Sequence, residues 1–129
     1  MQSGKKILVA DDDARNRKLL ETLLNSDGYQ VAAVNSGQAA LSAVAGDKPD
    51  LVMLDLMMPG MDGFEVLRRL KGSADWQDIP VVMVTALDDA GSRARMNAAG
   101  AADLLIKPVD RWKLKETLVR LLGGSHAAR

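Results

Sequence analysis

Five short apolar segments are spread along the chain, and longer segments with helical spacing separate them. The apolar segments are residues 5–10, 30–34, 51–54, 81–84 and 104–106. The first, third and fourth are apolar nearly throughout and show no alternation, which is typical of strands buried on both faces of a parallel sheet. We therefore predict five strands, three of them in the interior of the sheet.

The segments between these strands carry leucine and valine at helical spacing. Three apolar stripes are formed by Leu19, Leu20, Leu23 and Leu24, by Val66, Leu67 and Leu70, and by Leu114, Leu118, Leu121 and Leu122. Strands and helices therefore alternate five times, with short connections. This order predicts an α/β fold of the (βα)5 type, a doubly wound parallel five-stranded sheet with helices on both faces.

The helix boundaries have recognisable capping residues. Helix starts are indicated by Asp13, Ser36, Asp62, Asp88 or Asp89, and Asp110, whose side chains can accept from first-turn N–H groups. Asp62 and Glu65 have the spacing of a capping box. Gly28 and Gly46 suit helix ends, where a left-handed residue is needed. We predict one domain over residues 1–129, with its core at 5–122 and a flexible tail at 123–129.

Composition narrows the chemistry that this domain can perform. With 47% hydrophobic residues, a chain of this length can bury roughly two thirds of its unfolded surface without disulfides or a structural metal. It has no Cys, and its single His is His126 near the end. Thiol nucleophiles, thiolate zinc sites and His-based triads are therefore excluded or disfavoured. Any bound metal would need the oxygen ligands of Asp and Glu.

Charge and hydropathy argue against two classes of partner. The 17 Lys and Arg residues balance the 17 Asp and Glu residues, and no basic run occurs, so we expect no direct contact with nucleic acid. The first apolar segment is interrupted at once by Asp11, and no segment has the length of a membrane span. We therefore expect no membrane association, and the absence of Cys fits the reducing cytoplasm.

Polar residues follow four of the five predicted strands. These residues are Asp11, Asp12 and Asp13 after the first strand, Asp55 after the third, Thr85 after the fourth and Lys107 after the fifth. In open parallel sheets the site lies at the carboxyl ends of the strands, so these groups should meet at one edge. Converging carboxylates repel one another unless a cation such as Mg²⁺ lies between them. A metal beside a lysine and a hydroxyl can hold a phosphoryl group, and a carboxylate can accept it.

Each of these residues alone also has a purely structural explanation. Asp13 is most simply a helix cap, Thr85 an ordinary strand residue and Lys107 a surface lysine. Their joint occurrence at matching strand ends is what favours a functional site for Asp12, Asp55 and Lys107.

Four ordered motifs make the chain resemble the receiver domain of two-component response regulators. The motifs are ILVADDD at 7–13, PDLVMLDLMMPGMDG at 49–63, IPVVMVTA at 79–86 and GAADLLIKPV at 100–109. The resemblance covers residues 5–122 and implies a flavodoxin-like strand order 2-1-3-4-5. It also implies that Asp55 is the phospho-acceptor and that Mg²⁺ is the cofactor.

The same resemblance assigns expected roles to the surrounding residues. Asp12 would bind Mg²⁺ directly and Asp11 through water, with Asp55 and the backbone carbonyl of Met57 as further ligands. Thr85 would donate a hydrogen bond to a phosphoryl oxygen, Ala86 would leave room for it, and Lys107 would pair with the phosphate. Thr85, Ala86, Leu104 and Trp112 would belong to the switch and output region.

The resemblance implies a set of partners. A sensor histidine kinase or a histidine phosphotransfer protein would supply the phosphoryl group, and a downstream effector protein or domain would recognise the changed surface. The receiver would catalyse only its own phosphorylation and slow dephosphorylation, and so would not count as an enzyme in the ordinary sense. Dimerisation on phosphorylation stays open, as does whether the chain is a stand-alone receiver or a fragment of a larger regulator.

Some positions depart from the usual receiver pattern. Leu104 replaces the Tyr or Phe whose ring moves in the switch, so a leucine would have to report the change by packing. Ala102 stands where Asp is frequent. Met57 and Leu87 are apolar at positions that influence phosphate lifetime, and neither can orient an attacking water. We therefore predict a comparatively long-lived acyl phosphate.

The two tryptophans suggest different roles. Trp76 precedes the fourth strand, far from the expected site, and we predict that it packs against the sheet's opposite end. Trp112 opens the last helix out of phase with the apolar stripe of that helix, which predicts an exposed ring and a candidate anchor for a partner. The alternative for Trp112 is a simple role at the helix start.

Three other functions each have some support in the sequence. Asp11 and Asp13 after a first strand resemble haloacid-dehalogenase-type phosphatases, but that hypothesis leaves Asp55 unexplained. A flavodoxin-like FMN binder conflicts with three aspartates that would repel a ligand phosphate. A pseudo-receiver, an interaction module without phosphorylation, finds its one support in Leu104.

Overall fold

The computed structural model describes residues 4–123 and contains five strands and five helices within that range. In chain order they are β1 (Lys6–Ala10), α1 (Ala14–Ser26), β2 (Gln30–Val34), α2 (Gly37–Gly46), β3 (Leu51–Asp55), α3 (Gly63–Lys71), β4 (Val81–Thr85), α4 (Ala90–Ala98), β5 (Asp103–Ile106) and α5 (Arg111–Leu122). All ten predicted elements are present. The last residues of β3 and β4 are Asp55 and Thr85, one residue beyond the predicted strand ends.

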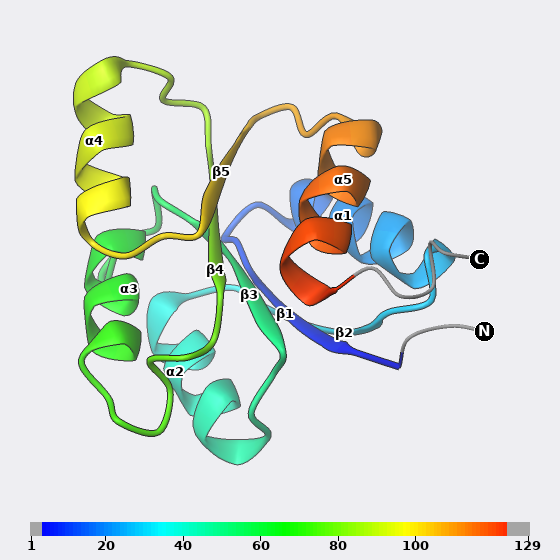
Figure 1. Ribbon diagram of the computed structural model, residues 1–129, viewed down its shortest axis with the longest axis horizontal. Coiled ribbons are helices and arrows are strands. Elements are labelled where there is room, and N and C mark those ends of the chain that lie inside the picture. The colour runs from blue at the N-terminus through cyan, green and yellow to red at the C-terminus, as the bar shows by residue number, and fades with distance from the viewer. Residues whose placement is uncertain (1–3, 124–129) are drawn as a thin grey trace.

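The strands form one parallel sheet in the order β2-β1-β3-β4-β5. Helices α1 and α5 cover one face and α2, α3 and α4 cover the other (Figure 1). Right-handed crossovers between parallel strands produce this arrangement. The predicted doubly wound α/β fold and its strand order are confirmed.

Each helix begins at a side chain that accepts a hydrogen bond from a first-turn N–H. The capping residues are Asp13, Ser36, Asp62, Asp89 and Asp110. Asp89, rather than its neighbour Asp88, caps α4. These bonds fix where each helix leaves the carboxyl end of its strand, which positions the loops of the site.

The predicted helix ends and capping box are only partly right. Gly28 has a left-handed φ of 92° and confirms the prediction. Gly46 lies at the end of α2 as predicted, but the prediction of a left-handed conformation there is wrong, because its φ is not positive. Asp62 accepts from the Glu65 N–H at 3.0 Å, but the Glu65 carboxylate pairs with Arg68 and Arg69.

Two hydrophobic clusters, one on each face of the sheet, make up the core. On the side of α2 to α4, the predicted stripe Val66, Leu67 and Leu70 is completely buried. On the other side, Leu20 and Leu24 of α1 pack with Leu114 and Leu118 of α5. Trp76 is half-buried against the first cluster, which confirms its predicted packing role.

Leu19 contradicts the predicted apolar stripe of α1. Its side chain is 43% exposed, because the buried face of α1 runs through Leu20 and Leu24 and Leu19 lies on the flank of that face. The four leucines of the predicted stripe span more of the helix circumference than the sheet can cover.

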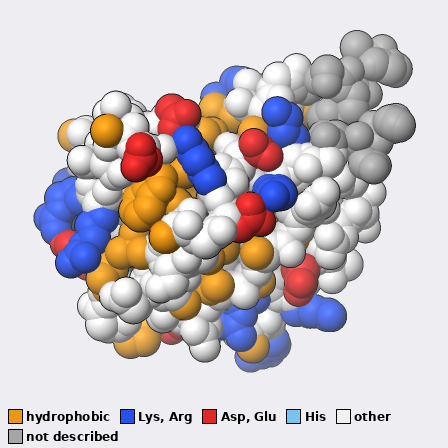
Figure 2. Space-filling view, turned by 90° about the horizontal axis from the view of Figure 1, so that it is seen from below, with side chains coloured by type: hydrophobic (Ala, Val, Ile, Leu, Met, Phe, Trp, Pro, Cys, Tyr) orange, Lys and Arg blue, Asp and Glu red, His pale blue; other side chains and the backbone are white. Residues whose placement is uncertain are grey.

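The surface carries both charge signs around exposed apolar side chains. On the face seen in Figure 2, Lys and Arg gather at the left edge, on the side of α3 and α4, and acidic and basic side chains are both present around a central hydrophobic area. Within residues 4–123, no helix is long and apolar enough to cross a membrane. The predicted tail lies outside the described residues apart from Gly123.

Candidate functional site

The predicted site residues lie together at the carboxyl edge of the sheet. Asp11 directly follows β1 and Lys107 directly follows β5, while Asp55 and Thr85 end β3 and β4. The strand register aligns these ends, since Asp55 pairs with Val84 on one side of β4 and Thr85 is the last β4 residue paired with β5. Four separate segments therefore contribute to one site.

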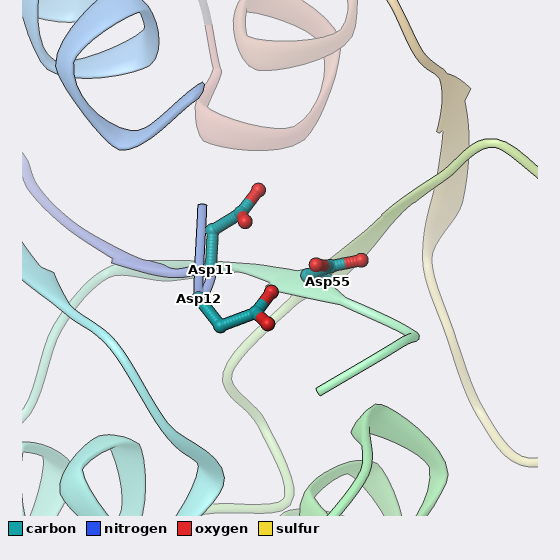
Figure 3. A group of neighbouring side chains, drawn as sticks. All are labelled: Asp11, Asp12 and Asp55. Carbon is teal, nitrogen blue, oxygen red and sulfur yellow. The ribbon is translucent and has the colours of Figure 1, made fainter. Parts of the chain in front are cut away.

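Three carboxylates meet at this edge. One oxygen from each of Asp11, Asp12 and Asp55 lies within 4.8 Å of the others (Figure 3). Asp11 and Asp55 are buried, whereas Asp12 is exposed. This oxygen-only set suits a hard divalent cation such as Mg²⁺, which takes few protein carboxylates and keeps several waters.

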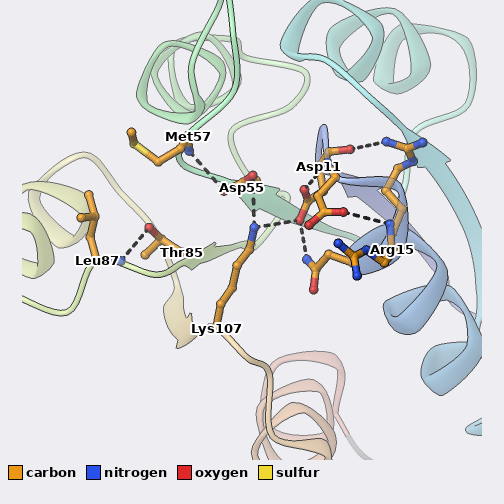
Figure 4. A network of polar contacts seen from close by, with 10 residues as sticks. Asp11, Arg15, Asp55, Met57, Thr85, Leu87 and Lys107 are labelled. Atoms are coloured by element: carbon orange, nitrogen blue, oxygen red, sulfur yellow. Dashed lines mark hydrogen bonds and ion pairs between the residues drawn. The ribbon is translucent and has the colours of Figure 1, made fainter.

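A single ammonium group joins the two buried carboxylates. Lys107 Nζ lies 3.1 Å from Asp11 Oδ2 and 3.3 Å from Asp55 Oδ2 (Figure 4). Burial by itself lowers the pKa of Lys107, but the hydrogen bond to Asp11 and the charges of Asp55 and Asp11 outweigh it and raise the pKa overall. Lys107 therefore stays protonated at neutral pH.

The Asp55 carboxyl has a strongly shifted pKa. Burial first, and then the negative charge of Asp11, raises the pKa of Asp55 to about 6. The attraction of Lys107 and the Met57 N–H, which donates to Asp55 Oδ1 at 3.1 Å, oppose the shift only in part. One ammonium thus does not neutralise the carboxylates, and the residues present fit a site for an added cation.

Thr85 and the residue two positions after it form the side of the site next to β4. The Thr85 side chain is completely buried, and its Oγ1 accepts a hydrogen bond from the Leu87 N–H at 3.1 Å. The hydroxyl hydrogen stays available for an acceptor. Ala86 is exposed, and the Met57 and Leu87 side chains are 62% and 39% exposed. These two apolar side chains offer no polar atom that could hold a water.

The start of α3 is packed tightly against the end of β3. An added Cβ at Gly63 would lie 2.5 Å from the Asp55 carbonyl oxygen and 2.8 Å from Leu56 Cα. The Gly63 N–H donates to the Leu56 carbonyl at 3.0 Å. The glycine thus lets α3 approach the backbone of Asp55.

Two site contacts were not predicted from the sequence. Asn16 Nδ2 donates to Asp11 Oδ2, and Arg17 Nη1 donates to the Asp11 backbone carbonyl at 2.8 Å. Both donors are in the first turn of α1. Polar residues in the first turn of α1, close to Asp11 in the sequence, were the available indication of such contacts. The direction of each side chain, however, depends on how the chain passes from β1 into α1.

Two of the predicted switch and output residues, Leu104 and Trp112, contact other parts of the molecule than the acidic cluster. Leu104 of β5 is half-buried and packs against the core cluster below α3 and α4. Trp112 is 69% exposed, with Arg111 Cζ and Lys115 Nζ about 6 Å from its ring centre (6.0 and 5.9 Å). The predicted exposure of Trp112 is confirmed, whereas its role as an anchor stays a prediction.

Comparison with known proteins identifies one family. The family model described as response regulator receiver domain matches residues 7–119. The response regulator PleD of Caulobacter vibrioides is 48% identical over 105 residues, which cover 81% of this chain and 23% of PleD. The response regulator MprA of Mycobacterium tuberculosis is 42% identical over 116 residues, which cover 90% of this chain and 48% of MprA. The chain thus spans half or less of these relatives.

Solved structures show the same similarity. The receiver domain of the sensor histidine kinase PA1611 from Pseudomonas aeruginosa superimposes with a TM-score of 0.86 at 30% sequence identity, covering 94% of this chain and 99% of that one. In that protein a magnesium ion is coordinated in the active site cleft.

Proposed function

Because this chain belongs to the response regulator receiver family, we propose that it accepts a phosphoryl group on Asp55 from a phosphohistidine. The donor is a sensor histidine kinase or a histidine phosphotransfer protein. The observation that carries the proposal is the Asp55 carboxylate, which lies buried at the carboxyl edge of the sheet within reach of Lys107 and beside Asp11 and Asp12. A cytoplasmic location fits this role and stays a prediction.

The proposal includes Mg²⁺ as the cofactor. Asp12 and Asp55 would hold it directly, Asp11 through water, and the Met57 backbone carbonyl would complete the protein ligands. When bound, the ion neutralises the crowded carboxylates and the oxygens of the incoming phosphoryl group. Support comes from the incomplete neutralisation of Asp55, whose pKa is raised by burial and by Asp11, and from the magnesium ion in the PA1611 receiver.

The transfer itself needs little more than positioning and charge. An Asp55 carboxylate oxygen forms a bond to phosphorus as the bond from phosphorus to the donor imidazole nitrogen breaks, and that nitrogen keeps the electron pair. The Lys107 ammonium, already 3.3 Å from Asp55 Oδ2, pairs with a phosphoryl oxygen. The Thr85 hydroxyl donates its hydrogen bond to another. Hydrolysis of the product is slow and self-catalysed.

Phosphorylation would change the surface that a partner recognises. The phosphoryl group adds a charge of about −1.5 to −2, which draws Thr85 and Lys107 inward and shifts a conformational equilibrium. Ala86 leaves space for Thr85 to move, and Leu104 would transmit the change through packing. Trp112 would meet a downstream effector or, in a homodimer, a second receiver.

Phosphorylation by acetyl phosphate tests the acceptor. Intact-mass spectrometry should show an adduct of about 80 Da on the wild-type protein with Mg²⁺ and none on Asp55→Asn. Asp11→Asn should lower the rate of phosphorylation, but the adduct should still form on Asp55. An adduct that persists in Asp55→Asn but disappears in Asp11→Asn would support the phosphatase-like alternative, and no adduct at all would support a pseudo-receiver.

The apolar side chains at positions 57 and 87 lead to a proposal about phosphate lifetime. Neither Met57 nor Leu87 offers a polar atom to orient an attacking water, so the acyl phosphate of the wild-type protein should decay slowly. Asn in place of Met57 supplies such an atom. The decay of the 80-Da adduct, after removal of acetyl phosphate, should therefore be faster in Met57→Asn, and an equal or slower decay would contradict the proposal.

A further inference from the structure

The structure assigns a positioning function to Asn16: its side-chain amide holds the Asp11 carboxylate in the orientation needed for Mg²⁺ binding and keeps that carboxylate hydrogen-bonded when Lys107 turns to the phosphoryl group. The inference rests on the proposed function. It adds a residue outside the acidic cluster to the machinery of the site.

The Asp11 carboxylate is buried and has three donors from its own chain. Its Oδ1 accepts from the Asp13 N–H at 2.8 Å. Its Oδ2 accepts from Asn16 Nδ2 and lies 3.1 Å from Lys107 Nζ. Asp11 is only 1% exposed, so the loss of one donor leaves a buried carboxylate oxygen short of a hydrogen bond, which is costly.

Asn16 and Lys107 both contact Asp11 Oδ2, so Asn16 can hold this oxygen when Lys107 moves away. Lys107 is divided between Asp11 Oδ2 and Asp55 Oδ2, and pairing with a phosphoryl group on Asp55 draws it away from Asp11. Asn16 remains on Asp11 Oδ2 because it comes from α1, an element that does not carry the acceptor or the lysine. The amide is neutral, so it orients the carboxylate without cancelling the charge that attracts the cation.

The start of α1 is built to hold this amide in place. Asp13 caps the helix through the Arg15 N–H at 2.9 Å, which sets the position of the first turn. Arg17 then binds the Asp11 backbone carbonyl at 2.8 Å. Asn16 lies between these two fixed points, so its contact with Asp11 is a consequence of how β1 passes into α1. Such outer hydrogen-bond partners orient metal-binding carboxylates and tune metal affinity.

Removing the amide should weaken Mg²⁺ binding more than it affects folding. Alanine is the best helix former, so Asn16→Ala keeps α1 intact while it deletes the donor. Loss of an outer partner of a metal ligand lowers affinity about tenfold or more. We expect the Kd for Mg²⁺ to rise about tenfold, and the rate of phosphorylation by acetyl phosphate to approach that of the wild-type protein at saturating Mg²⁺.

The experiment is Mg²⁺ titration by calorimetry on the unphosphorylated full chain. The variants are Asn16→Ala, Asn16→Gln, which keeps an amide donor, and Asn25→Ala, a matched change at an exposed position of the same helix. Urea unfolding in EDTA is measured in parallel for each. Asn16→Gln should bind Mg²⁺ more tightly than Asn16→Ala, and Asn25→Ala should match the wild-type protein.

The outcomes separate this inference from the proposed function. If the wild-type protein binds Mg²⁺ and is phosphorylated, but Asn16→Ala binds within twofold of it, the positioning function is wrong and the receiver function stands. The same conclusion follows if Asn25→Ala weakens binding as much as Asn16→Ala, or if Asn16→Ala loses stability in EDTA with unchanged affinity. If the wild-type protein neither binds Mg²⁺ nor gains the 80-Da adduct, both proposals fail.

Discussion

The two ends of the sheet use the same residue types in opposite ways. At the amino end, Lys6 Nζ lies 2.9 Å from Asp47 Oδ1, the two side chains are 45% and 71% exposed, and each charge pairs with the other. At the carboxyl end, Lys107 serves the two carboxylates Asp11 and Asp55, both buried. The first arrangement is balanced and screened by water, whereas the second is unbalanced and shielded from water. Excess buried negative charge therefore distinguishes the functional end from the structural one.

The largest contrast should come from removing the lysine at each end. Lys107→Met leaves two buried carboxylates without their ammonium, and we expect the free energy of unfolding in EDTA at pH 7.5 to fall by about 3 kcal/mol. Mg²⁺ should restore part of this loss. Urea denaturation with and without Mg²⁺ measures both effects. A loss below about 1 kcal/mol would mean that the lysine does not stabilise the acidic cluster.

Glycine packing should differ between the two ends as well. Gly63→Ala places a methyl group against the Asp55 carbonyl and the Leu56 backbone, and we expect a loss of about 2 kcal/mol from overpacking. Gly46→Ala, at the end of α2, meets no neighbouring atom within 4 Å and should be neutral or stabilising by about 0.5 kcal/mol. Thermal unfolding of the pair tests this, and equal effects would contradict it.

The proposed acceptor, Asp55, should destabilise the ion-free protein in a pH-dependent way. The pKa of Asp55 is raised from 3.8 to about 6 in the folded protein by burial and by Asp11, so ionisation costs folding free energy as the pH rises through this interval. Asp55→Asn should therefore raise the free energy of unfolding by about 2 kcal/mol at pH 7.5 and leave it nearly unchanged near pH 4. Asp47→Asn provides the control, and a gain at pH 4 equal to that at pH 7.5 would refute the electrostatic cause.

The smallest effect is expected at the amino end. Lys6→Met breaks only the exposed pair with Asp47, which should change the free energy of unfolding by less than about 0.5 kcal/mol. The measurement is the same urea titration used for Lys107→Met, at low and high salt. A change comparable to that of Lys107→Met would show that burial does not explain the contrast between the two ends.

Much of the fold could be predicted because local patterns and topology agree. The unalternating strands, the capping residues and the helical stripes all indicated the doubly wound sheet, and the structure confirms each element. The errors concern positions where neighbours decide the outcome. Leu19 is apolar like a core residue, but no neighbouring element covers its side chain. Gly46 ends its helix without adopting a left-handed conformation.

The part of the candidate site that lies at the ends of the strands could be predicted from the sequence. The proximity of these residues could be predicted from the topology alone, because a parallel sheet brings the ends of their strands to one edge. They are Asp11, Asp12, Asp55, Thr85 and Lys107. Only the packed structure shows which carboxylates are buried and that Lys107 pairs with both Asp11 and Asp55. Side-chain direction and burial depend on elements distant in sequence, and spacing does not encode them.

By itself, the sequence determined the elements, the parallel sheet and the set of groups gathered at its carboxyl edge, because periodicity and capping chemistry are local properties of the chain and alternating strands and helices lead to a parallel sheet. The tertiary structure alone decided that Asp11 is buried and bound by Asn16 and Lys107 at one oxygen, and that Asp12 stays exposed. It also decided the pKa of Asp55, since desolvation and charge repulsion exist only once distant segments pack together.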